Sequence, residues 1–470
     1  MAGPNGFEKN SRLNGGKMKL TFLGATETVT GSKYLLTIGS KKILIDCGLF
    51  QGYKELRLRN WAPLPIDPHD IDAVIITHAH IDHSGYLPLL VKNGFQGKIY
   101  TTPGTKALCS ILLPDSGHLQ EEEARLANKY GFSKHKPALP LYTEKEAQTA
   151  LNYFETIDFD TPHQLFHDFS FEYHRAGHIV GAAMVKIKTQ KGSIVFTGDI
   201  GRPYDPVMKA PAFIQETDYL VMESTYGDRL HDATDPLPQM AQVINQTVKR
   251  GGSVIIPAFA VGRAQSLLYF IYELKRQGAI PKNIPVFLDS PMAIDATHLL
   301  CTYKEDHHLT AEQCQGLCRI ATYVNTPEES KEIDRHHMPQ IIIAASGMAQ
   351  GGRILHHLKV FAPDPKSTLL FTGFQAGGTR GARIVNGERQ VKIHGSLIPI
   401  RAQVVVMSST SAHADYQELL GWLKHFARPP KKVFITHGEP HSAQSLKEKI
   451  EKQFGFSCTI PSYLQTEDLL

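Results

Sequence analysis

The chain has 470 residues, of which 42% are hydrophobic and 20% charged, and its formal net charge is +4. This composition is ordinary for a folded globular protein and excludes a mainly disordered chain, and the length predicts two or three domains. No apolar run approaches the ~20 residues that a membrane helix needs, so we expect no membrane association. The six cysteines form no C-x-x-C pair, which is typical of reduced thiols and indicates a cytoplasmic protein.

The chain begins with a polar, glycine-rich segment and then changes to short β-type runs. Residues 1–17 contain no apolar stretch, so we predict a disordered leader. The first strands are expected at Lys19–Leu23, Tyr34–Ile38 and Lys42–Ile45. The third of these runs leads directly into Asp46.

The most informative stretch follows the apolar run Val74–Ile76. Four residues with metal-binding side chains fall within six positions: His78, His80, Asp82 and His83. Imidazole nitrogens together with a carboxylate oxygen are typical ligands of zinc. Four ligands this close would crowd a single ion that also needs other ligands, so two neighbouring ions fit better. A polar loop is the alternative in a chain with 23 histidines, but the H-x-H-x-D-H spacing after a buried strand favours a metal site.

Later strands also deliver one polar residue each. Strands are expected at 169–174, 192–197 and 218–222, and a polar residue follows each of them. In α/β sheets, sites form where strand ends meet loops, so one shared site would account for all of these residues. A turn carboxylate or a satisfied loop histidine would explain any one alone, whereas the recurrence favours a site made of Asp46, His78, His178, Asp199 and Glu223.

After residue 227 the pattern changes to helices that alternate with short apolar strands. This alternation predicts a parallel sheet covered by helices on both faces. Three of its strand-to-helix turns combine glycine with arginine, and a helix N-terminus with a guanidinium can bind phosphate. Glycine is also what a tight turn requires. The recurrence of arginine favours phosphate, so we predict substrate contacts from Arg263, Ser346, Gly347, Arg353 and Arg380.

From residue 403 the first pattern returns. A strand at 404–407 leads to His413, and a strand at 433–435 leads to His437. The simplest architecture is a first domain made of residues 18–227 and 403–470, interrupted by an inserted domain at 228–402.

These motifs resemble those of the metallo-β-lactamase superfamily and, within it, the β-CASP nucleases. The H-x-H-x-D-H run alone is similar to that of many hydrolases. The other matching positions extend over nearly the whole chain from Met18: Asp46, His178 in Ala-Gly-His, Asp199 in Phe-Thr-Gly-Asp, Glu223 in Glu-Ser-Thr-Tyr-Gly, His413 in Ser-Ala-His-Ala-Asp and His437 in Thr-His-Gly-Glu. The histidine at the last of these positions, His437, resembles the pattern of the RNA-cleaving branch of the family. The chain resembles a compact bacterial homologue of the eukaryotic pre-mRNA 3′-end cleavage subunit.

The resemblance implies a fold, an activity and a role for each matching residue. The fold would be α/β, a metallo-β-lactamase αββα sandwich with an inserted β-CASP domain. The activity would be zinc-dependent hydrolysis of single-stranded RNA by an endonuclease, a 5′–3′ exonuclease or both. Two Zn²⁺ per chain would be held by two ligand sets, with Asp199 bridging them: His78, His80 and His178 for one ion, and Asp82, His83 and His437 for the other. Asp46 would orient a ligand and the attacking water. His413, poised by Glu223, would protonate the leaving oxygen.

Two other functions are open at this stage. A small-molecule hydrolase of the same superfamily would need neither the inserted domain nor the His413/Glu223 pair. An inactive RNA-binding scaffold would be expected to have lost metal ligands, and here every ligand position is filled. A homodimer is possible. The sequence leaves open the mode of cleavage and the transcripts that are cut.

Overall fold

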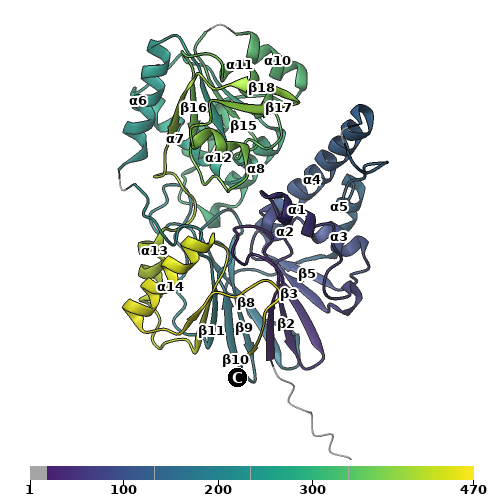
Figure 1. Cartoon of the computed structure of the whole chain (residues 1–470). Helices are drawn as coiled ribbons and strands as arrows, with labels where there is room; N and C mark the ends of the chain where they lie inside the picture. The colour runs from purple at the N-terminus through teal and green to yellow at the C-terminus, as the bar shows by residue number, and fades with distance from the viewer. Residues whose placement is uncertain (1–17, 132, 233, 337, 470) are drawn as a thin grey trace, which may run out of the picture.

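The computed structural model describes residues 18–469 apart from positions 132, 233 and 337. The predicted disordered leader lies outside the described residues. Figure 1 shows two stacked bodies, a lower domain that carries both ends of the described chain and an upper domain made of the inserted segment.

One sheet of the lower domain has seven strands within the described ranges, in the order β22-β1-β2-β3-β4-β5-β6. The strands are β1 (Met18–Phe22), β2 (Tyr34–Ile38), β3 (Lys41–Ile45), β4 (Ala73–Ile75), β5 (Lys98–Thr101), β6 (Phe154–Thr156) and β22 (Thr466–Leu469). β3 and β4 run parallel. Their ends therefore lie at the same edge of the sheet, where Asp46 and His78 follow.

The second sheet of this domain also has seven strands among the described residues, in the order β21-β20-β11-β10-β9-β8-β7. The strands are β7 (His163–Phe166), β8 (Phe169–Arg175), β9 (Ala183–Thr189), β10 (Gly192–Phe196), β11 (Tyr219–Met222), β20 (Lys432–Ile435) and β21 (Cys458–Thr459). β8 and β10 both pair antiparallel with β9, and β11 and β20 continue parallel to β10. These four strands thus end at one edge, just before His178, Asp199, Glu223 and His437.

The two sheets pack face to face through side chains that alternate along the strands. Leu20 and Phe22 of β1 are fully buried, and the rings of Phe22 and Phe434 lie 5.3 Å apart. Alternate residues of a strand point to the same face, so the opposite faces remain for helices. Each buried large apolar side chain contributes about 1.5–3 kcal/mol to stability.

Helices flank this sandwich on its outer sides (Figure 1). They are α1 (Lys54–Arg59), α2 (Ile81–Ser84), α3 (Leu87–Lys92), α4 (Pro103–Tyr130), α5 (Glu144–Ala150), α13 (Tyr416–Leu423) and α14 (Pro440–Phe454). Local signals set their ends: Thr102 Oγ1 accepts a hydrogen bond from the Thr105 amide at the start of α4, and Gly131, with a φ of 64°, ends that helix. The arrangement is the expected αββα sandwich.

The inserted domain contains a fully parallel sheet. Among the described residues it has six strands in the order β14-β13-β15-β12-β16-β19. They are β12 (Val254–Pro257), β13 (Val286–Asp289), β14 (Thr322–Tyr323), β15 (Ile341–Ala344), β16 (Thr368–Phe371) and β19 (Gln403–Val406), and a hairpin of β17 (Gln390–Ile393) and β18 (Ser396–Pro399) lies beside them. All four residues of β15 are buried, as expected for a strand covered on both faces.

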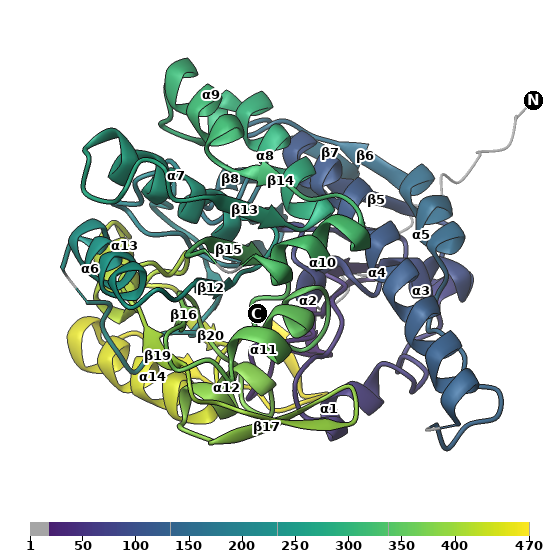
Figure 2. The ribbon, with the colours of Figure 1, turned by 90° about the horizontal axis from the view of Figure 1, so that it is seen from above.

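Figure 2 shows the helices on both sides of this sheet. They are α6 (Pro236–Lys249), α7 (Arg263–Arg276), α8 (Pro291–Thr302), α9 (Ala311–Ile320), α10 (Pro327–Arg335), α11 (Ile354–Phe361) and α12 (Arg380–Val385). β19 pairs with β16, so the structure extends the inserted domain to Val406, beyond the predicted boundary at residue 402. Within the described ranges, no helix combines the length and apolar character needed to cross a membrane.

Candidate metal centre

The site lies at the edge where the strands of both sheets end. His78 follows β4, His178 follows β8, Asp199 follows β10 and His437 follows β20. Sharp turns bring these side chains inward: Gly177 and Gly198, directly before His178 and Asp199, have φ values of 73° and 53°. His437 itself has a φ of 48°, which is uncommon for a residue with a side chain and occurs mainly at functional sites.

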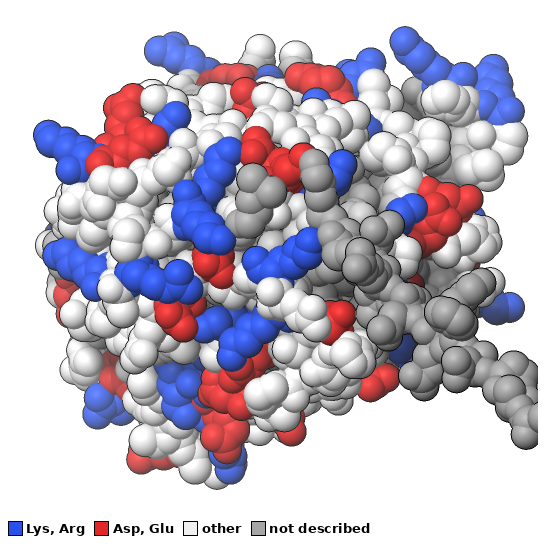
Figure 3. All heavy atoms as spheres, turned by 90° about the horizontal axis from the view of Figure 1, so that it is seen from below, with Lys and Arg blue, Asp and Glu red and all other residues white. Residues whose placement is uncertain are grey.

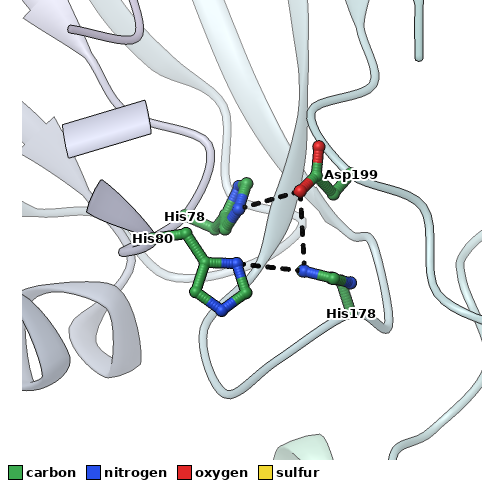
Figure 4. Close-up of side chains that lie close together, drawn as sticks. All are labelled: His78, His80, His178 and Asp199. Carbon is green, nitrogen blue, oxygen red and sulfur yellow. Dashed lines mark hydrogen bonds and ion pairs between the residues drawn. The ribbon is translucent and has the colours of Figure 1, made fainter. Parts of the chain in front are cut away.

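Four side chains converge on one point, as Figure 4 shows. His78 Nε2 lies 3.2 Å and His178 Nε2 3.5 Å from Asp199 Oδ2. His178 Nε2 also lies 3.1 Å from His80 Nδ1. Ligand atoms arranged tetrahedrally around one zinc ion, about 2.0–2.1 Å from it, lie about 3.4 Å from each other. The spacing of these four side chains therefore fits a single metal ion.

A second group lies on the other side of Asp199. His83 Nε2 and His437 Nε2 are 3.2 Å apart, and His437 Nε2 is 3.4 Å from Asp82 Oδ2. The second oxygen of the Asp199 carboxylate, Oδ1, lies 3.3 Å from His83 Nε2 and 3.5 Å from His437 Nδ1. Asp199 therefore faces both groups, one with each oxygen.

Hydrogen bonds outside the cluster orient the imidazoles. His83 Nδ1 donates to Asp46 Oδ2 at 2.7 Å, and His178 Nδ1 donates to the Ala412 carbonyl at 3.2 Å. Since each ring uses its Nδ1 proton outward, its neutral form presents the lone pair of Nε2 to the cluster. Thr77 Oγ1 links His78 Nδ1, at 3.1 Å, to Asp46 Oδ2, at 2.9 Å. Asp46 thus positions two of the imidazoles.

Burial favours the neutral form of three of these imidazoles, because it lowers the pKa of His78, His80 and His178. His78, His178 and Asp199 are at most 2% exposed, and burial lowers the pKa of His78 to about 3. His78 Nε2 and His80 Nε2 are buried atoms that have no hydrogen-bond partner in the described protein. Imidazole nitrogens that face one another at 3.1–3.2 Å need a proton or a cation between them, and neutral imidazole is the form that binds a metal. These residues fit the metal ions that the sequence predicts.

Comparison with known proteins agrees with this geometry. Family models match residues 28–242 (metallo-β-lactamase superfamily), 264–384 (Beta-Casp domain) and 397–461 (Zn-dependent metallo-hydrolase RNA specificity domain). Ribonuclease TTHA0252 of Thermus thermophilus is 34% identical over 91% of this chain and 95% of its own length. This chain belongs to the β-CASP RNA nucleases of the metallo-β-lactamase superfamily.

Other relatives of this β-CASP nuclease carry different names. Transcription termination factor FttA of Methanosarcina mazei is 32% identical over 96% of this chain and 72% of its own length. The RNase J-like protein of Methanocaldococcus jannaschii is 30% identical over 94% of this chain and 97% of its own length. A crystal structure of an Enterococcus faecalis protein of unknown function has a TM-score of 0.53 and covers 96% of this chain at 14% identity, which concerns the fold alone.

A histidine–glutamate pair lies beside the predicted metal ligands of the nuclease. His413 Nδ1 lies 3.1 Å from Glu223 Oε2, and His413 Nε2 lies 3.9 Å from Asp199 Oδ2. Glu223 Oε1 in turn accepts the Ile200 amide proton at 2.6 Å. Burial lowers the pKa of His413, but the charges of Glu223 and Asp199 outweigh this effect and raise it to about 9. His413, His80 and Asp82 are partly exposed, so a substrate can reach the cluster from their side.

The predicted phosphate-binding turns of the inserted domain differ from one another. Arg353 forms an ion pair with Asp289 and donates to the carbonyls of Val324 and Asn325. Arg380 donates to the carbonyls of Ala349 and Lys392. Because their own domain engages both guanidinium groups, the geometry argues against phosphate contacts through these arginines.

The turn at residue 346 also forms its own internal contacts. Ser346 Oγ accepts the amide protons of Gln350 and Gly351 at 3.1 and 3.4 Å. A Cβ added at Gly347 would lie 2.7 Å from the Phe259 ring, which is a packing reason for glycine there. Of the predicted substrate contacts, Arg263 is the one whose guanidinium forms no hydrogen bond or ion pair with any described residue.

Two residues that position the imidazoles were not predicted from the sequence. Thr77 connects Asp46 to His78, and Thr225 Oγ1 lies 3.1 Å from His437 Nδ1. Both threonines directly adjoin a motif residue or its loop, but a threonine hydroxyl has no ligand spacing by which a sequence pattern could single it out.

On the face seen from below, basic and acidic side chains are interspersed (Figure 3), so that face presents no extended basic surface for a nucleic acid.

Proposed function

We propose that this nuclease holds two Zn²⁺ and hydrolyses phosphodiester bonds of single-stranded RNA at the cluster around Asp199. The observation that carries the proposal is the pair of imidazole groups that face each other across this carboxylate. His78, His80 and His178 would hold one ion, Asp82, His83 and His437 the other, and Asp199 would bridge them. When bound, the ions would lower the pKa of water and neutralise charge on the phosphate.

The surrounding residues supply orientation and a proton. Asp46 fixes His83 directly and His78 through Thr77, which keeps the ligand atoms in place before substrate arrives. Glu223 holds the Nδ1 side of His413, so Nε2 is free to face the substrate. From there it can donate a proton to the leaving oxygen of the sugar, the usual role of a positioned histidine in general acid catalysis.

The test combines metal analysis with three substrates. Protein purified without chelator is expected to contain about two zinc ions per chain and to cleave labelled single-stranded RNA, and chelation should abolish cleavage until zinc is restored. A β-lactam or lactone and a labelled DNA strand serve as comparison substrates. Zinc-loaded protein that binds RNA without cutting it, or that hydrolyses the lactone in preference to RNA, contradicts the proposal. A cytoplasmic location and a homodimer remain predictions.

A further inference from the structure

Arg263, the first residue of α7, is a buried arginine without a partner. Its side chain is 8% exposed, and it forms no hydrogen bond or ion pair with any described residue. Its Nε is a buried donor with no partner among the described residues. A guanidinium carries five N–H donors, and buried arginines normally use them on carboxylates or carbonyls, as Arg353 does. Arg263 is therefore an exception within its own domain.

The charge of Arg263 has no counter-ion in contact. Burial lowers its pKa to about 10, so the guanidinium remains charged at neutral pH. The carboxylate of Asp205 influences this pKa, but its Oδ1 accepts the amide protons of Val207 and Met208 at 2.8 Å and forms no ion pair with Arg263. A buried, unpaired charge is strongly unfavourable unless a ligand of opposite charge completes the site.

The guanidinium lies where the two domains meet. A Cβ added at Gly373 would be 3.5 Å from Arg263 Nε and 3.9 Å from Nη2, so the glycine leaves space in front of the donors. Thr410 Oγ1 donates to the Thr372 carbonyl at 2.8 Å, which joins the Gly373 turn to the loop that carries His413. The Tyr226 ring lies 5.8 Å from Phe374 and 6.2 Å from His413.

Two further donors lie in these joined segments. Thr372 Oγ1 and Ser409 Oγ are buried and have no hydrogen-bond partner in the part of the chain that the structure describes. Thr372 directly precedes Gly373, and Ser409 directly precedes the Thr410 that bonds to Thr372. A guanidinium and hydroxyl groups on adjoining segments are donors of the kind that bind a phosphate group.

We propose that Arg263, with the hydroxyls of Thr372 and Ser409, binds a second phosphate of the RNA, next to the scissile one on the His413 side. This inference rests on the proposed function, because it assigns a subsite to the same substrate. A phosphate held there would fix the strand on the side of the general acid. The same chemistry suits an internal phosphodiester and a terminal phosphate.

The test compares substrates with one and with several phosphates. Arg263→Met keeps an apolar stem and removes the charge, and we expect a 10–100-fold loss of kcat/KM on labelled single-stranded RNA. The loss on bis(p-nitrophenyl) phosphate, which has no second phosphate, should be at most a few-fold. Arg263→Lys should recover part of the RNA rate. Equal losses on both substrates, or none on RNA, overturn the subsite.

Further variants keep the test decisive if Arg263→Met folds poorly. Gly373→Ala leaves Arg263 in place and puts a methyl group in front of it, so the same selective loss on RNA is expected with unchanged thermal stability. Arg353→Met is the matched control and should lower stability without discriminating between the substrates. RNAs that begin with a 5′-phosphate or a 5′-hydroxyl separate the two phosphate sources. A subsite for a terminal phosphate would favour the 5′-phosphate RNA, whereas a subsite for an internal phosphodiester would treat both RNAs alike.

Binding measurements separate this inference from the proposed function. Labelled single-stranded RNA titrated into the full-length metal-free protein should bind 10–100-fold more tightly to the wild type than to Arg263→Met, with a steeper salt dependence. If the wild type cleaves no RNA, the proposed function fails, and this comparison still decides the subsite. Equal affinities would overturn it.

Discussion

Two buried clusters of histidine and carboxylate, one in each domain, differ in whether they are complete. In the inserted domain, His357 donates from Nε2 to Asp289 at 2.8 Å and from Nδ1 to Asp334 at 2.6 Å. Asp289 also pairs with Arg353 and accepts from Ser330 Oγ. Each polar group of this cluster has a protein partner of the right kind, so the cluster needs no further component.

The cluster around Asp199 has the same residue types, but its inner ring nitrogens are not each paired with a carboxylate. Its imidazoles use their outer nitrogens on Asp46 and Ala412, and their inner nitrogens face one another. Residue type and burial alone therefore do not identify a metal site. A saturated cluster stabilises its domain, whereas one whose inner nitrogens converge is suited to bind an ion.

The largest effect should follow the loss of the shared ligand. Asp199→Ala is expected to release metal from both positions and reduce RNA cleavage to background, because one carboxylate faces both ligand groups. Metal content and cleavage of labelled RNA are measured together. Asp334→Asn, in the complete cluster, is the matched control and should retain its zinc. Full activity of Asp199→Ala with one ion or none would contradict the two-metal arrangement.

Removal of His413 should reduce RNA cleavage less than removal of Asp199 and should leave the metal in place. His413→Ala is expected to lose about 10²–10⁴-fold in kcat on RNA, the usual contribution of positioned proton transfer, with unchanged zinc. The loss should shrink on a nitrophenyl phosphodiester, whose leaving group needs no proton. Glu223→Gln should give a milder form of this pattern. An equal loss of rate on both substrates would leave His413 as a positioning residue.

A smaller effect is expected from the residue that orients the ligands. Asp46→Asn should weaken zinc affinity or activity about 10–100-fold, the typical result when the hydrogen-bond partner of a ligating histidine is changed. Competition with a zinc-binding dye measures the affinity. Thr77→Val removes only the link to His78, so its zinc affinity should be closer to that of the wild type. Unchanged zinc affinity in Asp46→Asn would show that the ligands do not need this support.

The complete cluster should affect stability and leave activity almost untouched. The pKa of His357 is lowered by burial but raised overall to about 9 by Asp289 and Asp334. A raised pKa adds stability that is fully present below the unfolded-state pKa of about 6.5 and is lost as the pH rises through 9. His357→Gln should therefore cost about 3 kcal/mol at pH 6 and less at pH 10.

Urea unfolding at both pH values measures this difference, with zinc content and RNA cleavage as controls. A penalty that is the same at pH 6 and pH 10 would mean that the charge of His357 is not what stabilises the domain. A loss of zinc in His357→Gln would contradict the contrast between the two clusters.

Much of the metal centre could be predicted from the sequence because its signal is local. The spacing from His78 to His83 depends on one strand and one turn, and the remaining polar residues each follow a strand of their own. Strand ends meet at sheet edges, so the pattern predicts convergence without the coordinates. The predicted strand limits Tyr34–Ile38 agree with the structure for the same local reason.

The arginines show where the sequence no longer suffices. Arg263, Arg353 and Arg380 stand in similar strand–glycine–helix turns, and local patterns do not distinguish them. Arg353 is paired because Asp289, 64 positions earlier in the chain, ends a neighbouring strand in the same sheet. Arg263 has no such partner. Whether a buried charge is satisfied depends on contacts between distant segments, which only the fold decides.

Local turns and the alternation of side chains are enough to predict the candidate ligands, their spacing, the strand–helix periodicity and the insertion of one domain into another. The tertiary structure decided the rest: that Asp199 faces both ligand groups, that β19 joins the inserted sheet, that Thr77 links Asp46 to His78, and that Arg263 alone of the three predicted phosphate-binding arginines lacks a partner. These are relations between residues far apart in the chain, and they form only when the sheets and helices pack.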